Sequence, residues 1–62
     1  MCESSVYFRN GEDERLVLED VVLIRPAPGA VYIEDILGRS QEVKGRIELI
    51  DLMNHRVVIS DR

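Results

Sequence analysis

Hydrophobic residues along this chain recur mostly at every second position. The pattern is clear in residues 5–8 and 31–34, where apolar and polar side chains alternate. Such alternation is typical of strands with one buried face. Val and Ile together outnumber Leu, which also favours strands over helices. A helix over Glu12–Leu23 is the rival interpretation, because Glu, Leu and Arg are good helix formers, but its Val-rich end and its period of two favour a strand.

Glycine and proline divide this pattern into short segments. Asn10-Gly11, followed by two acidic residues, predicts a hairpin turn, since both residues tolerate a positive φ. Arg25–Gly29 contains two prolines and a glycine and predicts the end of a strand. Asp35–Arg39 contains Gly38 and ends the next strand. The first half of the chain therefore predicts three short strands.

The second half contains one longer alternating segment, Gln41–Asp51, with Gly45 in its middle. A glycine inside a strand usually marks a bulge or a sharp corner. Met53–Arg56 predicts a tight turn before a last strand at Val57–Ile59. Five to seven short strands would expose edges unless the sheet curls. We therefore predict an all-β fold, a small rolled sheet or an SH3/Sm-like barrel, with an edge paired across a homodimer.

The length limits how stable such a fold can be. Sixty-two residues predict a single β domain, 1–62, which buries only about 60% of the surface of its unfolded chain. Small folds without disulfides or metals often gain burial by forming oligomers, so we expect a homodimer. The predicted core consists of Val6, Phe8, Leu16, Leu18, Ile24, Val31, Ile33, Val43, Ile47, Leu49, Val57 and Ile59.

Composition narrows the class of protein further. The net charge of −4 disfavours both nucleic-acid backbones and anionic membranes as partners. The longest apolar run, Val21–Ile24, is too short to cross a bilayer, and no signal peptide is recognisable. One cysteine excludes a disulfide within the chain and fits a reducing compartment. We expect a cytoplasmic protein without a membrane partner.

Acidic pairs are the only pattern that suggests catalysis. They occur at Glu12-Asp13-Glu14, Glu19-Asp20 and Glu34-Asp35. Neighbours in a strand point to opposite faces, so these carboxylates do not converge on one substrate. No glycine-rich loop precedes a helix, so no phosphate site is recognisable. We predict that the protein is not an enzyme.

Several short motifs resemble those of a known family. They are the start Met1-Cys2 that runs into Val6, the asparagine-glycine-acidic turn before Leu16-Val17-Leu18-Glu19-Asp20-Val21, Asp35-Ile36-Leu37-Gly38, Gly45-Arg46-Ile47-Glu48-Leu49-Ile50-Asp51, and His55-Arg56 before the last strand. In this order and spacing, the chain resembles the CooT-type family of small nickel-binding accessory proteins. The resemblance implies a homodimer of β subunits that binds one Ni(II) through Cys2 of both subunits. It also implies a role as metallochaperone or nickel store in the maturation of carbon monoxide dehydrogenase, so a nickel enzyme or its maturation machinery is an expected partner.

The chemistry of Cys2 agrees with this interpretation. Thiolates are soft ligands that suit nickel, zinc or copper. If Met1 is removed, the thiolate and the free α-amine of Cys2 form a five-membered chelate ring. Two subunits then supply an S₂N₂ set, which Ni(II) or Cu(II) accepts in a tetragonal or square-planar geometry. A cysteine near a terminus is otherwise most often a small apolar residue at the start of a strand. His55 is a second candidate ligand, although a role in fixing its turn is the better interpretation.

Two other functions stay open. A small RNA-binding module could use Arg39, Lys44 and Arg46 together with Tyr7 or Tyr32, because such binding combines basic and stacking side chains. This set of cations is small for a net-acidic chain. The third interpretation is a structural dimerisation module of a larger assembly.

Overall fold

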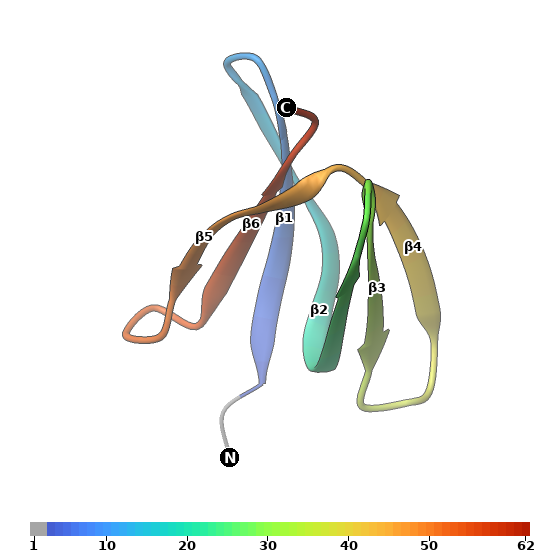
Figure 1. The fold of residues 1–62 in the computed structure, drawn as a ribbon. Coiled ribbons are helices and arrows are strands. Elements are labelled where there is room, and N and C mark those ends of the chain that lie inside the picture. Colours follow the sequence, from blue (N-terminus) through green and yellow to red (C-terminus); the bar gives the residue numbers. More distant parts are fainter. Residues whose placement is uncertain (1–2) are drawn as a thin grey trace.

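Residues 3–62 of the computed structural model form one six-stranded sheet, as Figure 1 shows. The strands are β1 (Ser4–Asn10), β2 (Asp13–Ala27), β3 (Ala30–Asp35), β4 (Ser40–Lys44), β5 (Arg46–Asp51) and β6 (Arg56–Ser60). Their order across the sheet is β4-β3-β2-β1-β6-β5. All neighbours are antiparallel except β1 and β6, which are parallel. The predicted all-β fold is confirmed. Of the rival helix Glu12–Leu23, Glu12 lies in the turn and the rest lies in strand β2.

The sheet rolls up but does not close, because β4 and β5 are its two edges. Most of the curvature comes from β2, which pairs with β1 through its first part and with β3 through its second. Between these parts Asp20 has a left-handed backbone, with φ of 57°. A rolled sheet, rather than a barrel, is therefore the correct form of the prediction. No helix among residues 3–62 is long and apolar enough to span a membrane.

Gly45 forms the corner between the two edge strands, as its position predicted. Its φ is 137°, and a Cβ atom there would lie 2.1 Å from the carbonyl oxygen of Ser60. Its backbone N–H donates a hydrogen bond to the Gly29 carbonyl at 3.0 Å. Only glycine fits this close approach of three chain segments. The corner turns the chain from β4 directly into β5.

The other predicted turns are also confirmed, with one change of boundary. Gly11 adopts φ of 66° in the hairpin between β1 and β2. The segment Arg25–Gly29 was expected to end a strand, yet β2 continues through Pro26, which lies opposite Val31. The reversal itself occupies only Pro28 and Gly29, because glycine supplies the positive φ, 77°, that the turn needs.

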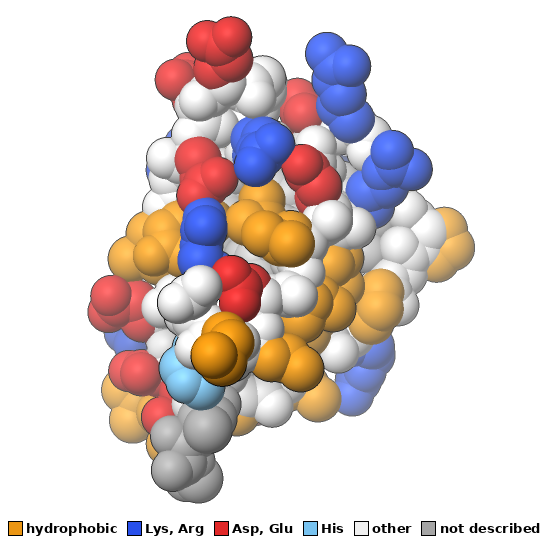
Figure 2. Space-filling model, turned by 90° about the vertical axis from the view of Figure 1, so that its left-hand side faces the viewer, with side chains coloured by type: hydrophobic (Ala, Val, Ile, Leu, Met, Phe, Trp, Pro, Cys, Tyr) orange, Lys and Arg blue, Asp and Glu red, His pale blue; other side chains and the backbone are white. Residues whose placement is uncertain are grey.

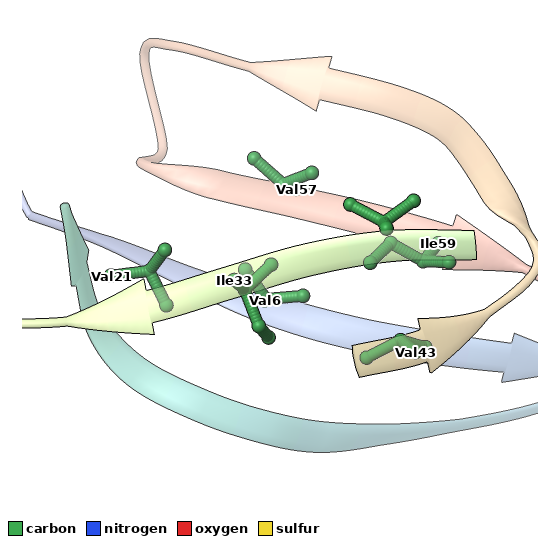
Figure 3. Packing of buried hydrophobic residues seen from close by; sticks show 7 residues of the cluster. Val6, Val21, Ile33, Val43, Val57 and Ile59 are labelled. Atoms are coloured by element: carbon green, nitrogen blue, oxygen red, sulfur yellow. The ribbon is translucent and has the colours of Figure 1, made fainter. Parts of the chain in front are cut away.

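The core lies inside the roll, where side chains from five strands meet (Figure 3). Its buried members are Val6, Val21, Val31, Ile33, Val43, Val57 and Ile59. Phe8, Val17, Leu18, Ile24 and Ile47 pack against them and are partly buried. Ten of the twelve predicted core residues thus belong to the core or its margin. The exceptions are Leu16 and Leu49, which are exposed.

Leu16 and Leu49 were assigned to the wrong face because each strand contains a bulge. In β2 the register shifts so that Leu16 lies opposite Tyr7 while Leu18 lies opposite Val6. In β5 the register shifts between Ile47 and Leu49, which places Leu49 opposite Val58. A bulge inserts one residue and reverses the alternation beyond it. Val21 and Val58 are buried instead, and the sequence analysis did not place either in the core.

Candidate metal-binding end of the sheet

The predicted metal ligand, Cys2, lies outside the residues that the structure describes. The described chain begins at Glu3, and β1 starts at Ser4. Ser5 donates a backbone hydrogen bond to the His55 carbonyl at 2.9 Å, and Ser4 lies opposite Val21 of β2. In Figure 1 the start of β1, the β3–β4 turn and the β5–β6 turn all lie at the lower end of the molecule. This end of the sheet is therefore the candidate site.

The β5–β6 turn, Leu52–His55, flanks β1 on one side of this end. His55 has a left-handed backbone with φ of 54°, which confirms the predicted turn geometry. The side chain that closes the turn belongs to Asp51. Asn54 donates its backbone N–H to Asp51 Oδ1 at 3.2 Å and its side-chain Nδ2 to Oδ2 at 2.9 Å. These hydrogen bonds with Asn54 hold the pKa of Asp51 below its ordinary value.

His55 thus contributes its backbone to the site through the hydrogen bond from Ser5. The His55 ring is exposed on the face that Figure 2 shows. Its role as a second nickel ligand remains a prediction. Within the described part of the chain, no three His, Cys, Asp or Glu side chains come together as a ligand set.

The β3–β4 turn, Ile36–Arg39, flanks the same end on the other side, next to the bend of β2. Asp35, the last residue of β3, has a fully buried side chain. Its Oδ1 accepts hydrogen bonds from the backbone N–H groups of Leu37, at 3.0 Å, and Arg39, at 2.8 Å. Its Oδ2 accepts a hydrogen bond from the side-chain Nε of Arg39 at 2.7 Å. The backbone N–H of Ile36 donates to the Asp20 carbonyl at 2.9 Å, which joins the turn to β2.

Asp35 stays ionised in this buried position because the hydrogen bonds outweigh the cost of burial. Burial raises the pKa of its carboxyl group. The hydrogen bonds from the backbone and side chain of Arg39 and from the Leu37 backbone lower it more, so the pKa of Asp35 lies below its ordinary value. The sequence analysis treated Asp35 as a solvated strand end. A sequence signal was present in the glycine and arginine three and four residues later, which allow the chain to fold back onto the carboxylate.

Large apolar side chains are exposed on both turns. In the β5–β6 turn, Leu52 and Met53 are 78% and 89% exposed, and Ile50 of β5 is 55% exposed. In the β3–β4 turn, Leu37 is 74% exposed and Ile36 is 51% exposed. Exposed apolar patches that are held in a fixed shape are typical of interaction surfaces. The end of the sheet that carries the N-terminal segment is thus also its most apolar end.

Three of the five side chains of the RNA hypothesis, those of Tyr7, Tyr32 and Arg39, have partners within the protein. The guanidinium of Arg56 stacks on Tyr7, 4.7 Å from the ring centre, and that of Arg25 stacks on Tyr32 at 5.6 Å. Tyr32 also donates its hydroxyl to Glu34 at 3.2 Å. Arg39 is bound by Asp35. Lys44 and Arg46, the other two residues of this hypothesis, are exposed, and RNA binding stays a prediction.

Comparisons with known proteins agree on one family. The family described as CO dehydrogenase accessory protein CooT matches residues 1–60 of the 62. An uncharacterised protein of Methanothermobacter thermautotrophicus is 37% identical over 59 residues, which covers 95% of this chain and 88% of that protein. A crystal structure provisionally assigned to CooT of Carboxydothermus hydrogenoformans superimposes with a TM-score of 0.87 at 31% identity and covers 98% of each chain.

These matches fix the family and the kind of role. The structural match covers 98% of this chain, so the two proteins share the fold. The family consists of accessory proteins rather than enzymes. The chain belongs to the CooT family of CO dehydrogenase accessory proteins.

Proposed function

We propose that this protein carries one Ni(II) ion between two copies of the chain, as cargo for the maturation of CO dehydrogenase. Cys2 of each copy is the proposed ligand. The proposal is supported by the family, whose matching region includes residue 2, and by the single cysteine, which is the only thiolate the chain contains. Nickel is the substrate of such a carrier rather than a permanent part of it.

One copy of the chain supplies too few donor atoms for a four-coordinate nickel ion, so a second copy is needed. With Met1 removed, Cys2 supplies a thiolate sulfur and an α-amine nitrogen, which are two donors. Four-coordinate Ni(II) needs four donors, and sulfur and nitrogen suit it. Two copies that bring their N-terminal segments together supply an S₂N₂ set. The exposed ring of His55 is a further donor of the right kind.

The observation that carries the proposal is the position of this end of the sheet. Ser4 and Ser5, which follow Cys2 closely in the sequence, are held between β2 and the β5–β6 turn. That place lies between two apolar turns that can exclude water from an interface.

A nickel titration of the full chain tests the proposal. We expect saturation at about half an equivalent of nickel per chain, with a thiolate-to-nickel charge-transfer band in the near ultraviolet. Affinity should fall as the pH drops below the thiol pKa of about 8.5, because the ligand must lose its proton, although bound metal lowers that pKa. Cys2→Ser should remove the band and most of the affinity. The matched control His55→Ala should change the affinity much less.

The fold must be monitored in the same experiment. Far-ultraviolet circular dichroism of Cys2→Ser should equal that of the wild type, because the residue precedes the first strand. An unchanged nickel isotherm for a folded Cys2→Ser protein would rule out the proposed site.

A further inference from the structure

A cavity of about 710 Å³ lies where the end of β1, the start of β5 and the end of β6 meet. In Figure 1 the β1–β2 hairpin and the C-terminal end, which border this cavity, lie at the top of the molecule, away from the start of β1. Its polar lining consists of three arginines, two acidic residues and a serine: Arg9, Arg46, Arg62, Glu48, Asp61 and Ser60. Small-molecule sites typically have volumes of about 300–1,000 Å³. The cavity is therefore large enough for a small ligand.

The pairing of the strands explains why a hollow forms at this place. Ser60 of β6 lies opposite Arg46 of β5 and also opposite Arg9 of β1. Residues directly opposite each other in a sheet share one face, so the short serine side chain lies between two long arginine side chains. A Cβ atom at Gly45 would lie 2.1 Å from the Ser60 carbonyl oxygen, which shows how closely the start of β5 approaches the end of β6. The hollow is thus built into the register of three strands.

Ser60 supplies a buried hydroxyl group to this cavity. The residue is only 6% exposed, and its Oγ accepts a hydrogen bond from the backbone N–H of Arg62 at 3.2 Å. That bond uses a lone pair of the oxygen and leaves the O–H hydrogen to donate. The segment after β6 is also held by Asp61, whose backbone N–H donates to the Arg9 carbonyl at 3.3 Å. These two hydrogen bonds keep Arg62 at the cavity.

The three arginines of the cavity differ in their acidic partners. Arg9 Nη1 donates a hydrogen bond to Glu48 Oε2 at 2.9 Å, and Arg9 Nη2 lies 3.7 Å from Glu14 Oε1. Arg46 and Arg62, by contrast, form no ion pair within the described range, residues 3–62. Three arginines against two acidic residues leave one positive charge in the lining, although the net charge of the chain is −4. One guanidinium is therefore held in place, and two are open to an anion.

We propose that this cavity binds the phosphate group of a small molecule, with Arg46, Arg62 and the Ser60 hydroxyl as its direct contacts. Guanidinium groups bind both carboxylates and phosphates through paired hydrogen bonds. A carboxylate has two oxygens in one plane, which a single guanidinium satisfies, whereas a tetrahedral phosphate presents oxygens on several sides. Donors that come from β5, from β6 and from the segment after it match the phosphate better. A phosphate group fills only part of the cavity, so the organic part of a phosphate ester has room beside it.

A titration of the full chain with inorganic phosphate, followed by two-dimensional amide NMR spectra, tests the inference. At about 0.15 M salt, exposed charges more than about 8 Å apart are largely screened. We expect saturable shifts at the amides of Arg46 and residues 60–62. Arg46→Gln and Arg62→Gln change exposed side chains, so both variants should fold, and each should weaken binding at least about tenfold. The matched control Arg25→Gln removes the same charge outside the cavity and should change the affinity less than about twofold.

Three further probes test the class of ligand. Acetate should bind more weakly than phosphate, and glycerol phosphate should shift the same amides as inorganic phosphate. Shifts that do not saturate, or an equal loss of affinity in Arg25→Gln, would overturn the site, because they would show attraction by overall charge alone. Acetate that binds as tightly as phosphate would overturn the ligand class. Single-stranded RNA that binds more tightly than glycerol phosphate, with shifts extending to Lys44 and Arg39, would place the phosphate in a nucleic acid and overturn the inference of a small ligand.

Discussion

The β3–β4 and β5–β6 turns, at the end of the sheet where β1 starts, have a similar order of residue types but are held by different hydrogen bonds. Each begins with an aspartate at the end of a strand, continues with two exposed apolar residues, and ends at an arginine: Asp35-Ile36-Leu37-Gly38-Arg39 and Asp51-Leu52-Met53-Asn54-His55-Arg56. Each contains a left-handed residue, Gly38 with φ of 86° and His55 with φ of 54°. The second turn is one residue longer.

The aspartates differ in burial and in their partners. Asp35 is buried and accepts three hydrogen bonds, two of them from the backbone of its own turn. Asp51 is only partly buried and bonds to one residue, Asn54. The β3–β4 turn is therefore an integral part of the fold, whereas the β5–β6 turn is held at the surface.

Removing each aspartate should give the largest difference between the turns. Asp35→Ala removes a buried carboxylate that accepts three hydrogen bonds from Leu37 and Arg39 and so holds the turn together, which is a severe defect. We expect its melting temperature to fall by more than about 10 °C and that of Asp51→Ala by less than about 5 °C, because water can replace the Asp51 carboxylate. Thermal unfolding followed by circular dichroism measures both. Similar losses for the two variants would contradict the comparison.

Lowering the pH should also show how much each aspartate contributes to stability, because it protonates the two carboxylates gradually. Both carboxyl groups have a lowered pKa in the folded protein. The unfolded chain, with carboxyl pKa values of about 3.9, therefore binds protons first as the pH falls. Their stabilisation is complete above this value and is lost as the pH falls through the lower folded values.

Urea titrations between pH 7 and pH 2 measure this loss. The midpoint of the wild type should drop below about pH 4, and the drop should be smaller in Asp35→Asn, which has no carboxyl group to titrate there. Asp51→Asn serves as the comparison at the exposed turn. A wild-type midpoint that rises towards acid pH would show that the sign is wrong.

The left-handed residues should give the smallest effects. A Cβ atom on Gly38 would meet no atom within 4 Å, so Gly38→Ala tests the backbone alone. Alanine in this conformation costs about 1 kcal/mol. His55→Gly should cost nothing or stabilise slightly, because glycine adopts a positive φ without strain. Urea unfolding resolves both changes. An alanine at Gly38 without cost would mean that the turn can rearrange.

The sequence was sufficient to predict the strands and turns, but not which side chains of each strand point into the core. Alternation and glycine positions predicted the strands and the corner at Gly45, because these depend on local backbone preferences. Leu16 and Leu49 were misplaced, since a bulge depends on the register of the partner strand. The role of Asp35 was missed for a similar reason. Its partners lie in the turn that follows, and only the folded turn brings their N–H groups to the carboxylate.

The candidate site was predictable only in its chemistry. A lone cysteine after the initiator methionine indicates a soft ligand, and the family gives it a context. Neither tells which surfaces surround it. The two apolar turns and the tie between Ser5 and His55 emerge from the topology, which places β6 beside β1 in parallel.

Native mass spectrometry of the nickel-loaded full chain tests the shared site most directly. It reports the number of chains, the number of nickel ions and the presence of Met1 in one spectrum. We predict a species of two chains without Met1 and with one nickel ion, and a nickel-free dimer for Cys2→Ser. A nickel ion on single chains, or a nickel-bound dimer of Cys2→Ser, would contradict the sharing of nickel between two copies.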